Sequence, residues 1–196
     1  MNILVISASM RGGSQSFKVA EWLSDHVVSF GLESSVLDLH EVKLPLFDDG
    51  ETEAENLSQI LNDLKSADGY VFVSPEWNGM MSHGLINMLH FVENKEMAYK
   101  PVMLVGVSAG RGGTHPIDQM KVLGQKNRHY VISPENLIAN GIEKAFNSPD
   151  LNSDESDFVL KERADYSLKV LVELASSLSQ VRQSGVLNFE RFSNGV

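Results

Sequence analysis

Residues Ile3 to Phe17 read ILVISASMRGGSQSF, an apolar segment joined directly to a loop of serines, glycines and one arginine. The aliphatic run from Ile3 to Ile6 is typical of a buried central strand in a parallel sheet. A helix is expected from near Gln15 to Val27, and its free N–H groups and positive dipole end would face the loop. No acidic residue lies between Met1 and Val19. This strand–loop–helix junction is therefore a candidate anion site.

The residue types of the loop favour a terminal phosphate over a bridging pyrophosphate. A P-loop needs a lysine after its glycines, but none follows Gly12 and Gly13, and the dinucleotide fingerprint G-x-G-x-x-G is absent. The remaining donors are three hydroxyls and one guanidinium, from Ser9, Arg11, Ser14 and Ser16. The alternative is an ordinary turn whose serines only cap the helix.

The composition limits the class of protein. A chain of 196 residues with 42% hydrophobic content can bury one sizeable core, so residues 1–196 are predicted to form a single domain. The absence of cysteine excludes disulfides, thiolate metal sites and cysteine nucleophiles. A net charge of −10 argues against nucleic acid or an anionic membrane as partner. Without a signal peptide or a membrane-spanning stretch, a cytoplasmic protein is expected.

Strands and helices are expected to alternate along the chain. After the first strand and helix, strands are predicted at 34–39, 70–73, 102–107 and 129–132. An acidic loop covers 46–53, helices are predicted at about 53–67, 81–94, 114–124 and 154–181, and a tail covers 182–196. Repeated strand–helix units predict a parallel sheet with helices on both faces. Ligands of such sheets bind at the carboxyl ends of the strands.

Two further strand ends carry unusual loops. The strand at 70–73 is followed by S-P-E-W-N-G, residues 74–79, in which the tryptophan offers a flat surface and the asparagine a donor and an acceptor. The strand at 102–107 is followed by S-A-G-R-G-G, residues 108–113, whose glycines permit a close backbone approach. Together with the first loop, these residues would suit a planar heterocycle with a phosphate tail.

In this order, S-x-R-x-x-S, S-P-E-W-N-G and S-x-G-x-x-G-G resemble the motifs of the NADPH-dependent FMN reductase family, which includes azoreductases, chromate reductases and quinone reductases. The resemblance covers about residues 1–146. It implies a flavodoxin-like three-layer α/β sandwich with a five-stranded parallel sheet in the order 2-1-3-4-5. It also implies bound FMN, NADPH or NADH as electron donor, a small-molecule electron acceptor, and a homodimer or homotetramer.

The resemblance also assigns site residues. Those expected around the FMN phosphate come from the first loop: Ser9, Arg11, Ser14, Gln15 and Ser16. Those expected along the isoalloxazine ring come from the two later loops: Pro75, Glu76, Trp77, Asn78 and Gly79, and Ser108, Gly110, Arg111, Gly112 and Gly113. Trp77 replaces the usual tyrosine and Ser16 an asparagine, which keeps the chemistry. Residues 80–83 depart from the usual S-I-P-G, and His90-Phe91 replaces an Asp-Trp pair. The first of these two departures leaves the wall on the substrate side, and so the substrate, open.

The mechanism that the resemblance implies needs no protein nucleophile. A nicotinamide stacks on the flavin and gives a hydride to N5, and an acceptor then takes its place in a ping-pong cycle. N–H groups from Gly110 to Gly113 are expected to stabilise negative charge near N1. Glu76 is interpreted as a carboxylate that fixes its loop rather than as a general base. Arg111 either attracts cofactor phosphates or is a solvated surface charge.

The histidines do not predict a metal site. His83 and His90 are seven residues apart on one expected helix, a spacing that favours a surface or subunit-facing role. His115 is either a proton donor or a plain helix-start residue. The apolar arc formed by Leu85, Met88, Leu89 and Val92, with Met80, Met81 and Phe91 beside it, suggests a contact with a second subunit.

Three functions compete. The first is an NAD(P)H-dependent FMN oxidoreductase acting on quinones, azo compounds, metal oxyanions or free flavin. The second is a flavodoxin-type electron carrier, which the charge of −10 would suit because carriers dock basic partners. The third is a regulatory protein that binds no flavin. The S-P-E-W-N-G turn and the glycine–arginine loop favour the reductase.

Overall fold

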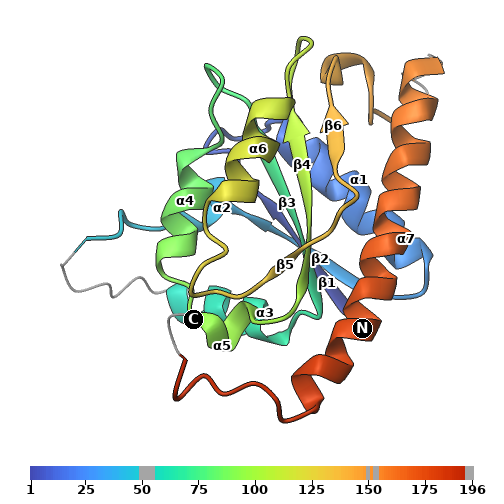
Figure 1. Cartoon of the computed structure of the whole chain (residues 1–196). Helices are drawn as coiled ribbons and strands as arrows, with labels where there is room; N and C mark the ends of the chain where they lie inside the picture. The colour runs from blue at the N-terminus through green and yellow to red at the C-terminus, as the bar shows by residue number, and fades with distance from the viewer. Residues whose placement is uncertain (49–55, 149–150, 152–154, 193–196) are drawn as a thin grey trace.

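A computed structural model describes residues 1–48, 56–148, 151 and 155–192, which form a parallel sheet between two layers of helices (Figure 1). The strands are β1 (Asn2–Ser7), β2 (Glu33–Asp38), β3 (Gly69–Pro75), β4 (Pro101–Val107), β5 (Val131–Ile132) and β6 (Leu137–Ala139). The helices are α1 (Gln15–Ser29), α2 (Leu39–Val42), α3 (Leu57–Ser66), α4 (His83–His90), α5 (Asn94–Met97), α6 (Thr114–Val122), the 3-10 helix η1 (Ile142–Lys144) and α7 (Glu155–Gln183). The order β2-β1-β3-β4-β5 confirms the flavodoxin-like prediction.

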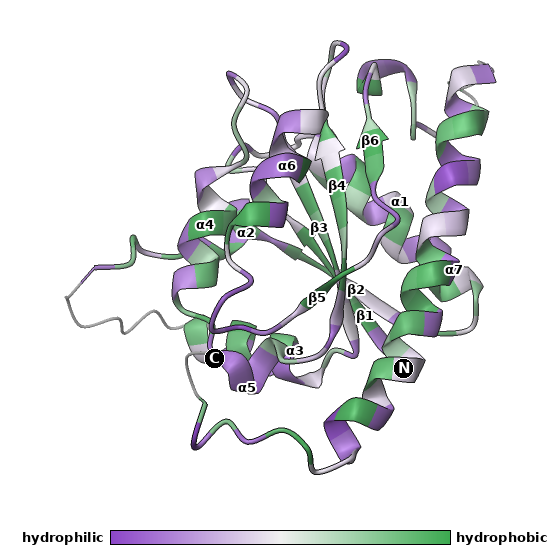
Figure 2. Cartoon of the chain, viewed as in Figure 1, coloured by the Kyte–Doolittle hydropathy of each residue, from purple (hydrophilic) through white to green (hydrophobic). Residues whose placement is uncertain are grey.

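Alternation along the strands explains the two layers. Ile3 and Val5 of β1 pack on the face that α1 and α7 cover, whereas Leu4 and Ile6 pack on the face that α3 to α6 cover. Figure 2 shows the green strands enclosed by helices of mixed colour. The central strands β3 and β4 are buried along their whole length, so their sequences read as continuous apolar runs. In the described part of the chain, no helix is long and apolar enough to cross a membrane.

The outer edge of the sheet differs from the prediction of one strand at 129–132. β5 pairs only with the start of β4, and the unpredicted β6 continues the same edge by pairing with the end of β4. Pro134 lies between them and has no N–H to donate to a ladder. The side chain of Asn136 instead accepts the N–H of Leu104 at 3.0 Å. The main-chain bonding of β4 therefore continues across the break.

Other boundaries also shift for local reasons. The predicted helix at 81–94 ends at His90, and the separate α5 begins where the Glu96 carboxylate accepts the N–H of Glu93 at 2.9 Å. The predicted strand at 34–39 ends one residue early because Asp38 caps α2 by accepting the N–H of His40. α3 begins at Leu57; the start of the helix predicted from 53 and most of the acidic loop lie outside the described residues.

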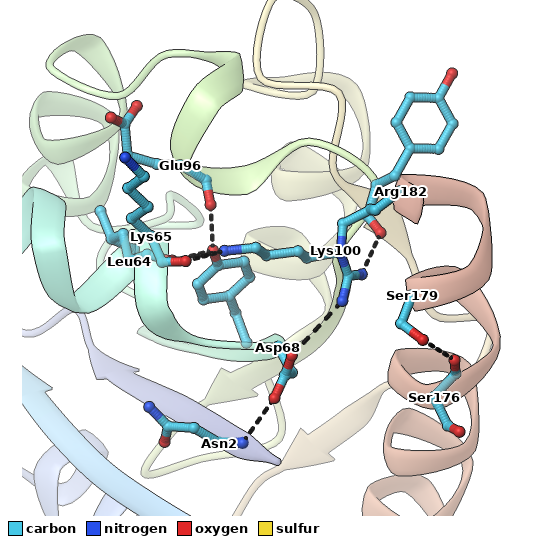
Figure 3. Close-up of polar contacts among 11 residues, drawn as sticks. Asn2, Leu64, Lys65, Asp68, Glu96, Lys100, Ser176, Ser179 and Arg182 are labelled. Atoms are coloured by element: carbon cyan, nitrogen blue, oxygen red, sulfur yellow. Dashed lines mark hydrogen bonds and ion pairs between the residues drawn. The ribbon is translucent and has the colours of Figure 1, made fainter. Parts of the chain in front are cut away.

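A buried polar cluster closes the end of the sheet where β1, β3 and β4 begin (Figure 3). Lys100 is 7% exposed, and its Nζ donates to the carbonyl of Leu64 in the last turn of α3 at 3.0 Å. Burial, reinforced by the charge of Arg182, lowers the pKa of Lys100 to about 8. Asp68 accepts the N–H of Asn2 at 2.9 Å and lies 3.6 Å from the Arg182 guanidinium. The cluster joins the start of β1 to α3 and to the end of α7.

Candidate functional site

A cavity of about 410 Å³ opens at the carboxyl ends of β1, β3 and β4, where the sequence predicts the ligand. Four chain segments line it, and one of them was not predicted. The lining residues are Ser9, Arg11, Gly12, Gly13, Ser14, Gln15 and Ser16 after β1, Pro75, Glu76 and Trp77 at the end of β3, Val107, Ser108 and Ala109 at the end of β4, and Ile142 after β6.

The structure separates the predicted site residues into two groups. Every residue predicted in the first loop lines the cavity, as do Pro75, Glu76, Trp77 and Ser108. The predicted residues that lie in the same loops but outside the lining are Asn78, Gly79, Gly110, Arg111, Gly112 and Gly113. The lining residues not assigned from the sequence are Gly12, Gly13, Val107, Ala109 and Ile142. The first four belong to predicted strands and loops but have no side-chain donor, whereas the position of Ile142 depends on tertiary packing.

The serines of the first loop have different roles. The Oγ of Ser14 caps α1 by accepting the N–H of Phe17 at 3.1 Å, and its own O–H can still donate to a ligand. Ser9 is fully buried, and its Oγ accepts the N–H of Arg11 at 3.1 Å, so it shapes the loop. Ser16 lines the cavity, and its buried Oγ has no partner among the described residues. A buried hydroxyl without a partner is costly, so Ser16 fits an acceptor bound in the cavity.

Arg11 and Trp77 join the first loop to the loop after β3. The guanidinium carbon of Arg11 lies 4.8 Å from the centre of the Trp77 ring, in cation–π contact. The ring centres of Trp77 and His83 are 6.4 Å apart. Both Arg11 and Trp77 line the cavity, so this face offers a cation and a flat aromatic surface side by side.

Trp77 lies at the base of a tight hairpin. Trp77 and Met80 exchange both main-chain hydrogen bonds at 3.0 Å. Between them, Asn78 and Gly79 have φ angles of 54° and 73°, the left-handed pair of a type I′ turn, for which Asn-Gly is a favoured sequence. Asn78 is exposed at the tip and lies outside the cavity lining. The turn therefore presents the tryptophan, not the asparagine, to the cavity.

The Glu76 carboxylate connects this hairpin segment to the glycine loop. Its Oε2 accepts the N–H of Gly113 at 2.5 Å, and its Oε1 lies 3.5 Å from Nδ1 of the exposed His115. The predicted loop-fixing role of Glu76 is confirmed. The N–H of Gly113 is not available for the predicted stabilisation of charge near the flavin N1, because it already donates to Glu76. Gly113 also packs so closely on β4 that a Cβ on Gly106 would lie 1.8 Å from its carbonyl oxygen.

The unpredicted wall follows β6. Ile142 is fully buried and lines the cavity, and its N–H donates to the carbonyl of Ser108 at 3.3 Å. From α1, the Nζ of Lys18 donates to the carbonyl of Ile142 at 2.8 Å. Burial lowers the pKa of Lys18, and the charges of Asp157 and Glu143 oppose that shift. The wall is therefore attached both to α1 and to the loop after β4.

The surface of α4 carries the two histidines. His83 and His90 are both exposed, and the His90 ring stacks on Phe47 with ring centres 5.1 Å apart. Within the described residues, no group of three acidic or histidine side chains is placed to hold a metal ion. The proposed subunit-facing arc is wrong for its main members, because the chain's own core buries them: Met81, Leu85, Met88, Leu89 and Val92.

Comparison with known proteins decides the family. Residues 1–143 match the model of the family described as NADPH-dependent FMN reductase. The chain belongs to this family. The prediction made from the three loop motifs is confirmed, together with the FMN and NADPH that it implied and the classification as an oxidoreductase.

Relatives of this FMN reductase family member include azoreductases. The NADPH azoreductase of Bacillus sp. (strain OY1-2) is 29% identical over 123 residues, which are 61% of this chain and 66% of that protein. The FMN-dependent NADPH-azoreductase of Staphylococcus aureus is 29% identical over 129 residues, 63% of this chain and 69% of that protein. The matched region thus spans about two thirds of each relative.

Solved structures of lower identity share the fold. An oxidoreductase from Corynebacterium diphtheriae gives a TM-score of 0.69 at 16% identity, covering 90% of this chain and 97% of that chain. A flavoenzyme NAD(P)H:(acceptor) oxidoreductase from Paracoccus denitrificans gives a TM-score of 0.66 at 15% identity, covering 89% of this chain and 97% of that chain. These likenesses show that the fold is shared over about nine tenths of this chain.

Proposed function

We propose that this chain is an NAD(P)H-dependent FMN oxidoreductase that transfers electrons to small-molecule acceptors. The observation that carries the proposal is the convergence of phosphate donors, a half-buried tryptophan and the start of the loop after β4, at Ser108 and Ala109, on one cavity. The names of the azoreductase relatives support azo compounds as one acceptor class. Quinones, metal oxyanions and free flavin are the other classes to test.

The unpartnered hydroxyl of Ser16, the O–H of Ser14, the Arg11 guanidinium and the N-terminal N–H groups of α1 form a donor set that fits the FMN phosphate. Bound FMN supplies hydride transfer at N5. Trp77 provides a flat apolar wall for the ring of the donor or acceptor. Glu76 holds the glycine loop at the cavity edge through the bond of its Oε2 to the N–H of Gly113.

The remaining parts of the proposal concern the whole protein. We propose that the chain acts as one flavin-binding domain, in the cytoplasm, as a homodimer or homotetramer; the family resemblance supports each point. Because the core buries most of the apolar arc of α4, a subunit contact there would have to use its exposed residues, such as Ile86. Light scattering that gives the mass of one chain at micromolar concentration would contradict the oligomer.

An absorbance spectrum of the purified protein tests the function. A flavin spectrum that anaerobic NADPH bleaches without a protein partner would support the reductase. FMN-loaded protein that neither NADPH nor NADH bleaches would favour the electron carrier. Protein that binds no added FMN would contradict both and leave the flavin-free regulator.

A further inference from the structure

Gln119 lies outside the three loop motifs but contacts one of them. It is half-buried in the middle of α6, and both ends of its side-chain amide bond to main chain of the Trp77 hairpin segment. Oε1 accepts the N–H of Met81 at 2.8 Å, and Nε2 donates to the carbonyl of Gly79 at 3.2 Å. One side chain therefore holds the hairpin on both sides of Met80.

A short hairpin needs such support. A type I′ turn with two hydrogen bonds is only marginally stable without packing. Here the base of the hairpin is fixed by the buried Ser74, whose Oγ accepts the N–H of Ser82 at 3.0 Å. Gln119 attaches the residues on either side of Met80 to α6. A second connection is made by Gly113, which directly precedes α6 and donates its N–H to Glu76. The hairpin and α6 are thus joined at two separate points.

We propose that Gln119 is a positioning residue that sets the place of the Trp77 ring at the cavity and thereby controls the binding of NAD(P)H and acceptor. The part of this inference that concerns NAD(P)H and acceptor binding rests on the proposed function. The position of the ring can be measured without turnover, so the two claims fail separately. Gln119 acts through the Gly79 and Met81 main chain, and the FMN phosphate is assigned to other residues.

Two variants separate this role from a general contribution to stability. Gln119→Leu keeps a similar volume but makes neither hydrogen bond at any pH. Gln119→Glu can accept the N–H of Met81, but as a carboxylate it cannot donate to the carbonyl of Gly79. Protonation restores that donor. The two hydrogen bonds of Gln119→Glu should therefore both form at low pH. An unperturbed glutamate carboxyl has a pKa of about 4.3, and half-burial beside a carbonyl oxygen raises it.

The experiment uses FMN-loaded protein in a Trp22→Phe background, which leaves Trp77 as the sole tryptophan. Acrylamide quenching of Trp77 fluorescence measures how well the ring is held, and steady-state rates with NADPH and a simple quinone give KM and kcat. For Gln119→Leu we expect a higher quenching constant and KM values for both substrates raised roughly tenfold, with FMN retained. Gln119→Glu, which keeps the bond to Met81, should show a smaller change in the same direction at pH 8 and return toward the parent at pH 5.

Gln59→Leu is the matched control, because among the described residues its amide has one local, solvent-exposed bond, to Asp63 one turn away on α3 at 2.7 Å. It should match the Trp22→Phe parent in both measurements. Trp77 quenching and KM values that stay at parent levels in Gln119→Leu would overturn the proposal. So would a Gln119→Glu variant whose quenching constant and KM values, relative to the parent, are the same at pH 8 and pH 5, and this comparison needs no leucine variant. A parent protein that neither NADPH nor NADH reduces would refute the proposed function, while the quenching data would still decide the role of Gln119.

Discussion

Replacing Gly112 with alanine should destabilise the protein through the same contact that Glu76→Ala removes. A Cβ on Gly112 would lie 2.8 Å from Oε1 and 2.9 Å from Oε2 of Glu76, too close for either oxygen to stay. The displaced carboxylate would lose its bond to the N–H of Gly113. A hydrogen bond to a charged group contributes about 1.5–3 kcal/mol, and the pair with the exposed His115 adds little. Each single variant should therefore lower the free energy of unfolding by about 1.5–3 kcal/mol.

The double variant makes the test specific. Without the Glu76 side chain, the new methyl group no longer meets the carboxylate, so Glu76→Ala/Gly112→Ala should be no less stable than Glu76→Ala alone. Urea unfolding of the FMN-free proteins gives the four free energies of the cycle. Gly110→Ala is the control, because nothing lies within 4 Å of its added Cβ. Additive losses in the double variant, or a Gly112→Ala protein as stable as Gly110→Ala, would show that the Glu76–Gly113 hydrogen bond does not stabilise the fold as proposed.

Three further predictions concern the cavity and the opposite end of the sheet. Arg11→Ala should raise the FMN dissociation constant about 10- to 150-fold, the equivalent of about 1.5–3 kcal/mol, in a fluorescence titration; wild-type affinity would remove Arg11 from the phosphate site. If NADPH and acceptor share the position beside Trp77, double-reciprocal plots should be parallel, and intersecting lines would indicate a ternary complex. Because the pKa of folded Lys100 is lowered to about 8, the unfolded chain binds more protons above that pH. Stability should therefore gain a contribution as the pH rises from about 8 toward 10, and the urea midpoints of Lys100→Met should lack it; equal pH profiles for the two proteins would contradict the assignment.

The sequence predicts those parts of the site that local chemistry determines. Pro75, Trp77 and Ser108 could be placed at the cavity because each lies at or just after the end of an apolar strand, and parallel strands bring their carboxyl ends together. Ile142 could not, because it follows a strand of three residues that gives no readable alternation. Gln119 was missed for a different reason: it sits on an ordinary helix face, and its partners are main-chain groups of a distant hairpin.

The same contrast holds for the fold. The order of the central strands follows from their apolar runs and the intervening helices, but the break at Pro134 required the structure. A proline between two short apolar pairs argues against a strand, and only the pairing of both halves with β4, bridged by the Asn136 amide, reveals that they belong to one edge. Apolar residues on α4 similarly could not be divided between core and surface until the packing of Leu85 and Met88 was known.

The interrupted edge formed by β5 and β6 affects how strongly this chain aggregates at high concentration. A sheet edge recruits foreign chains by offering consecutive unpaired N–H and C=O groups. Here an incoming strand would find only the two residues of β5 and the three of β6, separated by a proline, whereas a typical strand pairs over about 5–6 residues. Templated growth of this sheet from its β5–β6 side is therefore disfavoured by the backbone itself.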